Sequence, residues 1–256
     1  MRLYKFKGKI VLIILVTSSL IILFKSIIIN STYLAAEKKL CENPIFSVEN
    51  ALKQYEVSSK QSVKLDVPLV SQLPELLYGC EITSTTMMLN YKGINVDKLT
   101  LANEMKIDTT EIVRDVDGKI ISWGNPNVGF VGDITGEEAG FVIYPTAMVE
   151  SLEKYINPVD LTDEPYFKLE KYLSDGKPVV VWITADFGNP TLDASWIVNG
   201  EEITCSFNQH TVLLTGYDKD YIYYNDPLTY EKNKAVDKQV FIKSWQSIGS
   251  KALSYE

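Results

Sequence analysis

Histidine is nearly absent from this chain of 256 residues, which holds only His210. Cysteine is also scarce, since Cys41, Cys80 and Cys205 lie far apart and form no Cys-x-x-Cys pair. Zinc sites in proteins need three or four clustered histidine, cysteine or carboxylate ligands. The sequence therefore excludes a zinc site built on several histidines, and we expect neither a metal nor another cofactor.

Basic residues are in short supply beyond the N-terminal segment. Of the 25 Lys and Arg and the 33 Asp and Glu residues, residues 1–44 hold seven and two, which leaves a net charge of −13 on the rest. A surface of that sign repels the phosphates of nucleic acids. We therefore expect no nucleic-acid partner, and we attribute the acidity to solubility.

Charge is almost missing from residues 10–29, whose only charged residue is Lys25. In a helix, a run of this length spans about 30 Å, the thickness of the hydrocarbon core of a membrane. Four basic residues within residues 2–9 precede the run, and such a flank stays on the cytoplasmic side. We expect a single-pass membrane anchor in residues 1–30 and an extracellular remainder. A signal peptide cleaved near Ala36, which would release a secreted protein, is the alternative.

The rest of the chain divides into a polar stalk, residues 31–62, and one domain, residues 63–256. Helical patterns dominate the first half of the domain and β-rich patterns dominate the second. Helices are predicted at 80–91, 96–106, 144–156, 164–176 and 237–248, and strands at 63–70, 178–185, 195–204 and 210–226. Helices followed by an antiparallel sheet indicate the α+β class.

A cysteine begins one of the predicted helices, in the segment YGCEITSTTMMLNYKG. An odd number of cysteines in an extracellular chain leaves at least one free thiol. A helix N-terminus stabilises a thiolate, so Cys80 is a candidate nucleophile. The alternative role for Cys80 is that of a small buried apolar residue. One face of this helix carries Cys80, Ser84, Met87, Met88 and Tyr91.

His210 opens the first of two β-rich runs, and Asp226 closes the second. If the turn between them centres on Lys219, His210 opposes Leu228, and Asp226 is its diagonal neighbour on the same face. A shift of one residue would present Asn225 instead. We therefore expect an imidazole oriented by a carboxylate, with a structural histidine at a strand end as the alternative.

Gln72, Cys80, His210 and Asp226 follow one another in the order Gln, Cys, His, Asp, which resembles the papain-like cysteine peptidases. Three segments resemble more closely the cysteine-peptidase family 39-like domains: LDVPLVSQLPELLYGCEITSTTMMLNYKG, NPNVGFVGDITGEEAGFVIYP and NQHTVLLTGYDKDYIYYNDP. That family includes the double-glycine leader peptidases of bacteriocin exporters and stand-alone extracellular domains of Gram-positive bacteria. The resemblance covers about residues 63–250.

The resemblance implies a papain-like α+β fold and a cysteine peptidase that acts on a peptide or protein substrate. It assigns Cys80 as the nucleophile, His210 as the general base and Asp226 as the residue that orients the imidazole. Gln72 would bind the developing oxyanion together with the backbone N–H of Cys80. The chain lacks the transporter helices and the P-loop of the exporter-linked members, so processing of leader peptides is not implied.

Three other activities are compatible with these residues. A transpeptidase or a cell-wall peptide amidase would share the chemistry up to deacylation, and a non-catalytic binding domain would share the fold. A hydrolase with a Cys-His-His triad is excluded because the chain has one histidine.

A glycine-rich stretch interrupts the predicted helices between residues 107 and 144. Loops of this length in a compact domain often serve as lids or binding loops. We expect residues 118–140 to form one wall of the cleft that holds Cys80.

The predicted anchor leads to a test in whole cells. Protease added to intact cells should digest the domain, and the mature protein should keep residues 1–25. N-terminal sequencing of the mature protein makes the measurement. A mature N-terminus near Ala36, recovered from the culture medium, would show that the apolar run is a cleaved signal peptide.

Overall fold

The computed structural model describes residues 62–256. The anchor predicted for residues 1–30, the predicted stalk up to residue 61 and Cys41 lie outside the described residues. Between residues 62 and 256, no helix is long and apolar enough to cross a membrane.

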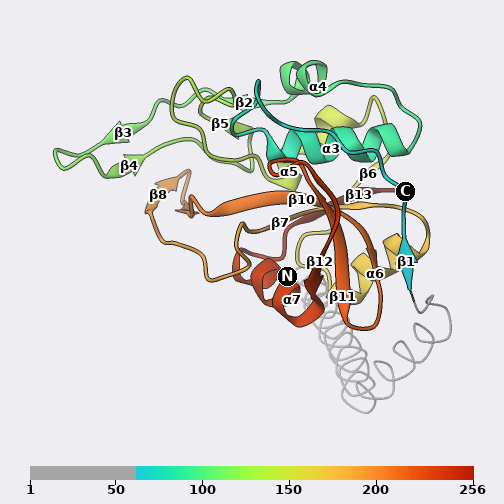
Figure 1. Ribbon diagram of the computed structural model, residues 1–256. Helices are drawn as coiled ribbons and strands as arrows, with labels where there is room; N and C mark the ends of the chain where they lie inside the picture. Colours follow the sequence, from blue (N-terminus) through green and yellow to red (C-terminus); the bar gives the residue numbers. More distant parts are fainter. Residues whose placement is uncertain (1–61) are drawn as a thin grey trace, which may run out of the picture. The chain divides into compact units, whose positions relative to one another are not determined.

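An antiparallel sheet runs through the domain, in the order β12-β11-β10-β7-β13-β6, and β1 pairs with β10 (Figure 1). Its strands are β1 (Val63–Lys64), β6 (Pro158–Asp160), β7 (Val179–Thr184), β10 (Gln209–Tyr217), β11 (Tyr221–Asp226), β12 (Glu231–Asp237) and β13 (Ala252–Tyr255). Helices flank this sheet: α3 (Cys80–Tyr91), α4 (Lys98–Glu104), α5 (Pro145–Leu152), α6 (Tyr166–Ser174) and α7 (Lys238–Ser247). The α+β fold predicted from the sequence is confirmed.

The sheet separates two apolar cores because successive side chains of a strand point to opposite faces. On β7, Val180 and Trp182 pack in the core that contains α3. Val181 and Ile183 pack in the core that contains α6 and α7. Figure 1 shows α3 on one side of the sheet and α6 and α7 on the other. Burial on both faces explains why β7 is a continuous apolar run in the sequence.

Helix α3 lies deeper than its amphipathic pattern predicts, because every residue from 81 to 89 is buried. Two of its four hydroxyl-bearing side chains make hydrogen bonds inside the protein, whereas the buried hydroxyls of Thr83 and Thr85 have no partner within residues 62–256. Thr86 Oγ1 donates to the carbonyl of Ile82, 2.9 Å away, within the same helix. Ser84 Oγ donates to the carbonyl of Thr211 on β10 at 3.2 Å. Tertiary packing therefore overrides the weak helix propensity of this segment.

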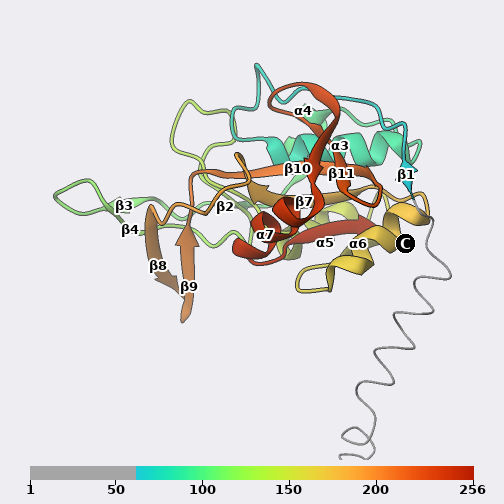
Figure 2. The same cartoon turned by 60° about the horizontal axis from the view of Figure 1, so that its bottom comes forward.

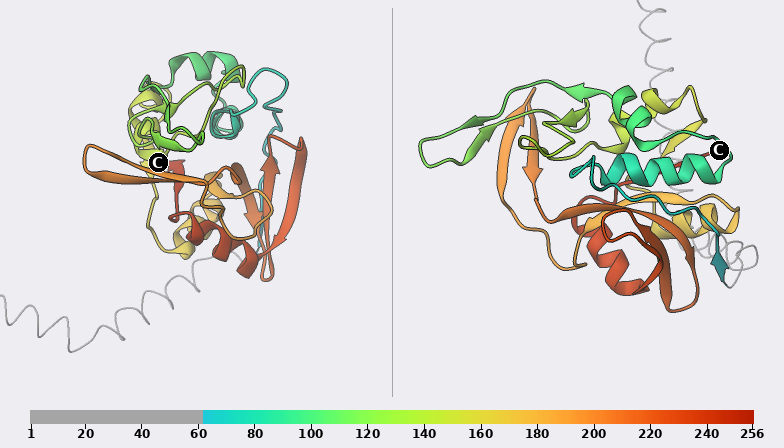
Figure 3. Two further views of the ribbon diagram at one scale, coloured as in Figure 1. Left: turned by 90° about the vertical axis from the view of Figure 1, so that its left-hand side faces the viewer. Right: turned by 45° about the horizontal axis from the view of Figure 1, so that its top comes forward.

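Two hairpins lie outside this sheet and extend toward the same side of the domain (Figures 2 and 3). They are formed by β3 (Val113–Arg114) with β4 (Ile120–Ser122) and by β8 (Ala194–Val198) with β9 (Glu201–Cys205). The predicted Asn199-Gly200 turn joins β8 and β9, and both residues have the positive φ of such a turn, 51° and 85°. Strand β4 contacts β8. A further short pair, β2 (Ile107–Asp108) with β5 (Phe130–Val131), lies within the glycine-rich stretch.

Some strand predictions differ from the structure. The strand predicted at 63–70 is limited to β1, and β6, β12 and β13 were not predicted. Strand β12 is an edge strand with many exposed charged residues, so it has no apolar alternation to reveal it.

Gly216 allows the close approach of β1 to β10 and gives a test of the sheet. A Cβ at this position would lie 2.1 Å from the carbonyl oxygen of Val63 and 2.8 Å from Cα of Lys64. Because both contacts are backbone, Gly216→Ala should lower the free energy of unfolding by about 1–3 kcal/mol, measured by urea denaturation. Gly188→Ala is the matched control, because there the new Cβ meets only the Asp186 side chain, at 3.0 Å. Equal stability of the two variants would contradict this packing.

Candidate functional site

Three of the residues predicted to form the site, Gln72, Cys80 and His210, line one cavity of about 290 Å³. We call it the Cys80 cavity. Its walls also include Leu77, Tyr78, Glu81, Gly140, Phe141, Val142, Ala185, Ser206, Phe207, Gln209 and Leu228. The fourth predicted residue, Asp226, does not line the cavity but contacts the imidazole of His210.

The packing of α3 on β10 places Cys80 and His210 in the same cavity. Cys80 is the first residue of α3, and the Ser84–Thr211 hydrogen bond lies one turn further along the helix. Thr211 follows His210 directly on β10. The start of the helix and the start of the strand therefore meet at the cavity.

His210 and Asp226 form the pair that the sequence predicted. Nε2 of His210 lies 2.9 Å from Oδ1 of Asp226, and both side chains are buried. The strands pair as predicted near the site, with Leu214 opposite Tyr224. Next to the turn the pairing is shifted by one residue, with Tyr217 opposite Ile222, and a bulge at Thr215 restores the register.

The carboxylate of Asp226 is held in its ionised form. Burial raises its pKa, but hydrogen bonds from His210 and from the backbone N–H groups of Leu228 and Thr229 outweigh this effect and hold the pKa well below its usual range. An ionised carboxylate can only accept, so Nε2 of His210 carries the proton. Nδ1 is the ring nitrogen that does not contact Asp226.

Asn225, the alternative partner of His210, is directed elsewhere. Its Nδ2 donates to the carbonyl of Val67 at 3.3 Å, and its Oδ1 accepts from the backbone N–H of Asn233 at 3.0 Å. It is fully buried and ties β11 to two neighbouring segments. Asn225 therefore has a structural role, and Asp226 is the residue that contacts the imidazole.

Gln72 is fixed at the edge of the cavity by the chain around it. Its Nε2 donates to the carbonyl of Leu77 at 2.8 Å, and its backbone N–H donates to the carbonyl of Pro227 at 2.9 Å. Lys98, the first residue of α4, donates to the carbonyl of Gln72 at 2.9 Å and pairs with Glu75 at 2.6 Å. The second N–H of the Gln72 amide remains available to a ligand.

Glu81 is a residue of the cavity that sequence reasoning missed. It is 1 % exposed, and its Oε2 lies 3.5 Å from Sγ of Cys80. Burial raises its pKa to about 8. An acid in the first turn of a helix is common, and at the surface it interacts favourably with the helix dipole. Its position in the sequence therefore does not reveal that this carboxyl is buried.

The environment of Cys80 differs from the expected one. Cys80 is partly exposed to the cavity, but protein atoms surround its sulfur. This desolvation, together with the carboxyl of Glu81, raises the pKa of the thiol well above its ordinary value, and the backbone of Thr211 opposes the change. The thiol is therefore the resting form, although the helix N-terminus alone favours a thiolate.

Cys205 is a second free cysteine in the described part of the chain, and it does not line the Cys80 cavity. It is fully buried, and burial raises its pKa to about 12. A buried thiol of this kind is inert, so Cys205 is a suitable control for Cys80.

The glycine-rich stretch contributes to the cavity mainly at its end. Gly140 lines the cavity, as do Phe141 and Val142, which follow it. Gly136 and Gly140 lie against Leu77 and Tyr78, where a Cβ would meet a side chain at 2.5 Å. The predicted wall is therefore narrower than residues 118–140, and part of that stretch supports the segment that leads to Cys80.

Comparisons with known proteins place this chain next to one family of peptidase-like proteins. The model of the Peptidase_C39 like family matches residues 64–253. The uncharacterized protein YvpB of Bacillus subtilis (strain 168) is 34% identical over 221 residues, which are 85% of this chain and 84% of that protein. The crystal structure of a proposed C39-like peptidase from Bacillus anthracis has a TM-score of 0.69 and 39% sequence identity, covering 77% of this chain and 98% of that one.

The buried carboxyl of Glu81 predicts a pH-dependent stability. Its pKa is higher in the folded protein than in the unfolded chain. The free energy of unfolding is therefore unaffected by this group below about pH 4.5, and it falls as the pH rises toward about 8. The Gln side chain of Glu81→Gln is neutral at every pH. The free energy of unfolding of this variant, minus that of the wild type, should therefore increase by several kcal/mol as the pH rises through this range. Urea denaturation at several pH values measures the difference, with the exposed Glu153→Gln as control. A difference that does not change with pH would contradict the buried state of Glu81.

Proposed function

The chain belongs to the Peptidase_C39 like family, and we propose that it is a cysteine peptidase that hydrolyses peptide bonds with Cys80 as the nucleophile. The observation that carries the proposal is that Cys80 and His210 line one cavity, while Asp226 holds the imidazole. A nucleophile, a base and a group that orients the base are the parts that covalent catalysis requires.

Proton transfer to His210 accompanies the attack of Cys80. Because the resting thiol is protonated, Nδ1 of His210 accepts the proton as Sγ bonds to the carbonyl carbon. Asp226 stabilises the imidazolium that forms, through its bond to Nε2. The imidazolium then protonates the amine that leaves, and it becomes a base again for the water that releases the acyl group.

The oxyanion of the tetrahedral intermediate needs hydrogen-bond donors near Sγ. The backbone N–H of Cys80 lies in the first turn of α3, where N–H groups have no acceptor within the helix. The free N–H of the Gln72 amide is the second donor, held in place by the Leu77 carbonyl. Together they form an oxyanion hole for the substrate carbonyl.

The enzyme acts outside the cell while attached to the membrane, since residues 10–29 have the length and composition of a spanning helix. Four preceding basic residues favour an orientation with the domain outside. If an amine replaced water in the last step, the same site would act as a transpeptidase, and the products of the reaction distinguish the two.

Hydrolysis of a synthetic peptide pool, followed by mass spectrometry, tests the role of Cys80. Cys80→Ala should abolish hydrolysis, and Cys205→Ala, which changes a buried thiol outside the cavity, should leave it nearly unchanged. An acyl group trapped on Cys80 by acid quenching would mark the intermediate. Hydrolysis that survives in Cys80→Ala would refute the proposal.

Asp226→Asn tests the imidazole in the same assay. The variant should fold, but kcat/KM should fall at least about 100-fold, because the neutral amide supports the imidazolium less well. Asn225→Ala should lower the stability but affect kcat/KM much less, since Asn225 bonds to Val67 and Asn233. A larger loss of kcat/KM in Asn225→Ala than in Asp226→Asn would reverse the assignment.

A further inference from the structure

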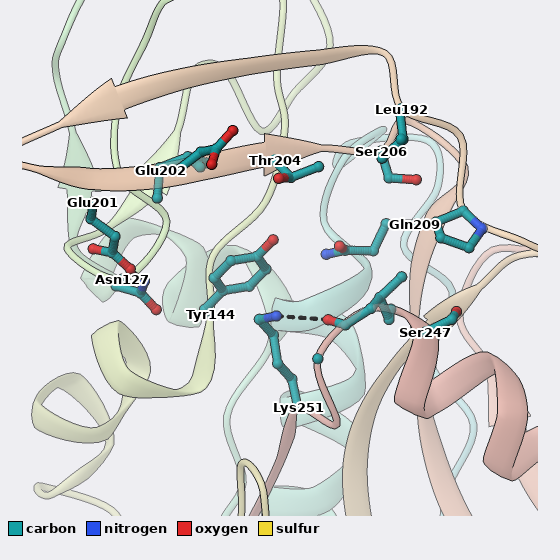
Figure 4. A pocket seen from close by; sticks show the side chains of 14 residues that line it. Asn127, Tyr144, Leu192, Glu201, Glu202, Thr204, Ser206, Gln209, Ser247 and Lys251 are labelled. Atoms are coloured by element: carbon teal, nitrogen blue, oxygen red, sulfur yellow. Dashed lines mark hydrogen bonds between the residues drawn. The ribbon is translucent and has the colours of Figure 1, made fainter.

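A second pocket, of about 380 Å³, adjoins the Cys80 cavity. We call it the Lys251 pocket. Ser206 and Gln209 line both spaces, so a chain bound at Cys80 can place a side chain in either. Figure 4 shows the pocket below the β8–β9 hairpin, with Tyr144, Gln209 and Lys251 gathered around its centre.

Among the described residues, the ammonium group of Lys251 has no carboxylate partner. Its Nζ donates to the carbonyl of Ile248 at 2.7 Å and lies 4.2 Å from the centroid of the Tyr144 ring. Within residues 62–256, no carboxylate oxygen lies within 4 Å of it. Burial lowers its pKa, and the more distant Asp160 and Asp163 oppose the change. A partly buried cation without an ion pair has lost part of its hydration without compensation, and a bound anion would relieve this.

Gln209 supplies a second donor at the same place. Its Nε2 is shielded from solvent and has no acceptor within 3.5 Å, and a weaker interaction with the hydroxyl of Tyr144 opposes the rise that burial causes in the pKa of that phenol. Buried amide N–H groups are almost always paired, so this one lacks a partner that a ligand can provide. The hydroxyl of Tyr144 points toward Gln209 in Figure 4. Gln209 also precedes His210 directly, which places this donor next to the proposed base.

The opposite end of the pocket is acidic. Glu201 and Glu202 line it, and the carboxylate of Glu201 accepts from Nδ2 of Asn125 and of Asn127, each at 2.8 Å. Like charges repel, so an anionic ligand avoids this end. The distribution of charge therefore directs an anion to Lys251 and Gln209.

We propose that the Lys251 pocket binds a carboxylate of the peptide substrate, either an Asp or Glu side chain or a free C-terminus. Lys251 supplies the positive charge, and Gln209 and Tyr144 supply hydrogen bonds. The identity of the occupant as substrate rests on the proposed peptidase function, but the binding of a carboxylate does not. This makes Lys251 a specificity-determining residue and not a catalytic one.

Binding is measured on the full chain carrying Cys80→Ala, so that no probe is cleaved. The probes are the capped peptide acetyl-Ala-Ala-Glu-Ala-Ala-amide, its Gln and Lys counterparts, and acetyl-Ala-Ala-Ala with a free or an amidated C-terminus. NMR titration follows the side-chain amide of Gln209 and the Nζ resonance of Lys251. We expect the Glu peptide, the peptide with the free C-terminus, or both to shift these resonances and to bind about tenfold more tightly than the matched uncharged peptide.

Variants then assign the effect to Lys251. Lys251→Met should remove the preference for the charged peptide and leave the affinity for the uncharged one unchanged, and Lys251→Arg should keep much of the preference. Lys243→Met, which removes an exposed charge on α7, is the matched control and should change nothing. Thermal denaturation verifies that each variant is folded.

Equal affinity for the charged and uncharged peptides would overturn the proposal, and so would a preference for the charged peptide that survives in Lys251→Met. Tighter binding of the Lys peptide would also overturn it, because the pocket would then bind a basic residue through Glu201 and Glu202. Failure of the peptidase proposal is separate, because an unreactive Cys80 in the wild type leaves the titration unaffected. Conversely, cleavage of peptides without any preference for acidic ones would support the peptidase proposal and contradict the proposed role of Lys251.

Discussion

Contact between α3 and β10 determines the relative position of the two halves of the site. The hydrogen bond from Ser84 to the carbonyl of Thr211 joins them one turn after Cys80 and one residue after His210. A change in how the helix lies on the strand would separate the thiol from the imidazole. The two apolar cores on either side of the sheet hold this arrangement, because β10 and its neighbour β7 are buried on both faces.

Burial around the site has opposite consequences for different groups. It raises the pKa of the Cys80 thiol and of Glu81, because neither charged form has enough donors around it. Asp226 is also buried, but four donors, which include the ammonium of Lys234 at 3.4 Å, compensate for the lost water and its carboxylate is ionised. The negative charge is thus fixed at Asp226, while burial favours the neutral forms of the Cys80 thiol and the Glu81 carboxyl.

Local patterns in the sequence were sufficient for the fold class and for the approach of His210 to Asp226, because alternation and turn residues act over short distances. The predicted register near the site was correct partly through compensation, since the bulge at Thr215 offsets a one-residue shift of the pairing next to the turn. Glu81 and Lys251 could not be recognised, because their significance depends on burial by segments that are distant in sequence. Strand β13 was missed for a similar reason, being a short strand that is fully buried between β6 and β7.

The central claim is that His210 accepts the proton of the Cys80 thiol. It is tested most directly by the rate at which iodoacetamide alkylates each cysteine, measured by peptide mass spectrometry from about pH 5 to 9. In the wild type, Cys80 should react near neutral pH despite its raised pKa, because His210 removes the proton. His210→Ala should slow this reaction at least about tenfold and leave Cys205 unchanged. Equal rates at Cys80 in the two proteins would show that the thiol only packs against the sheet.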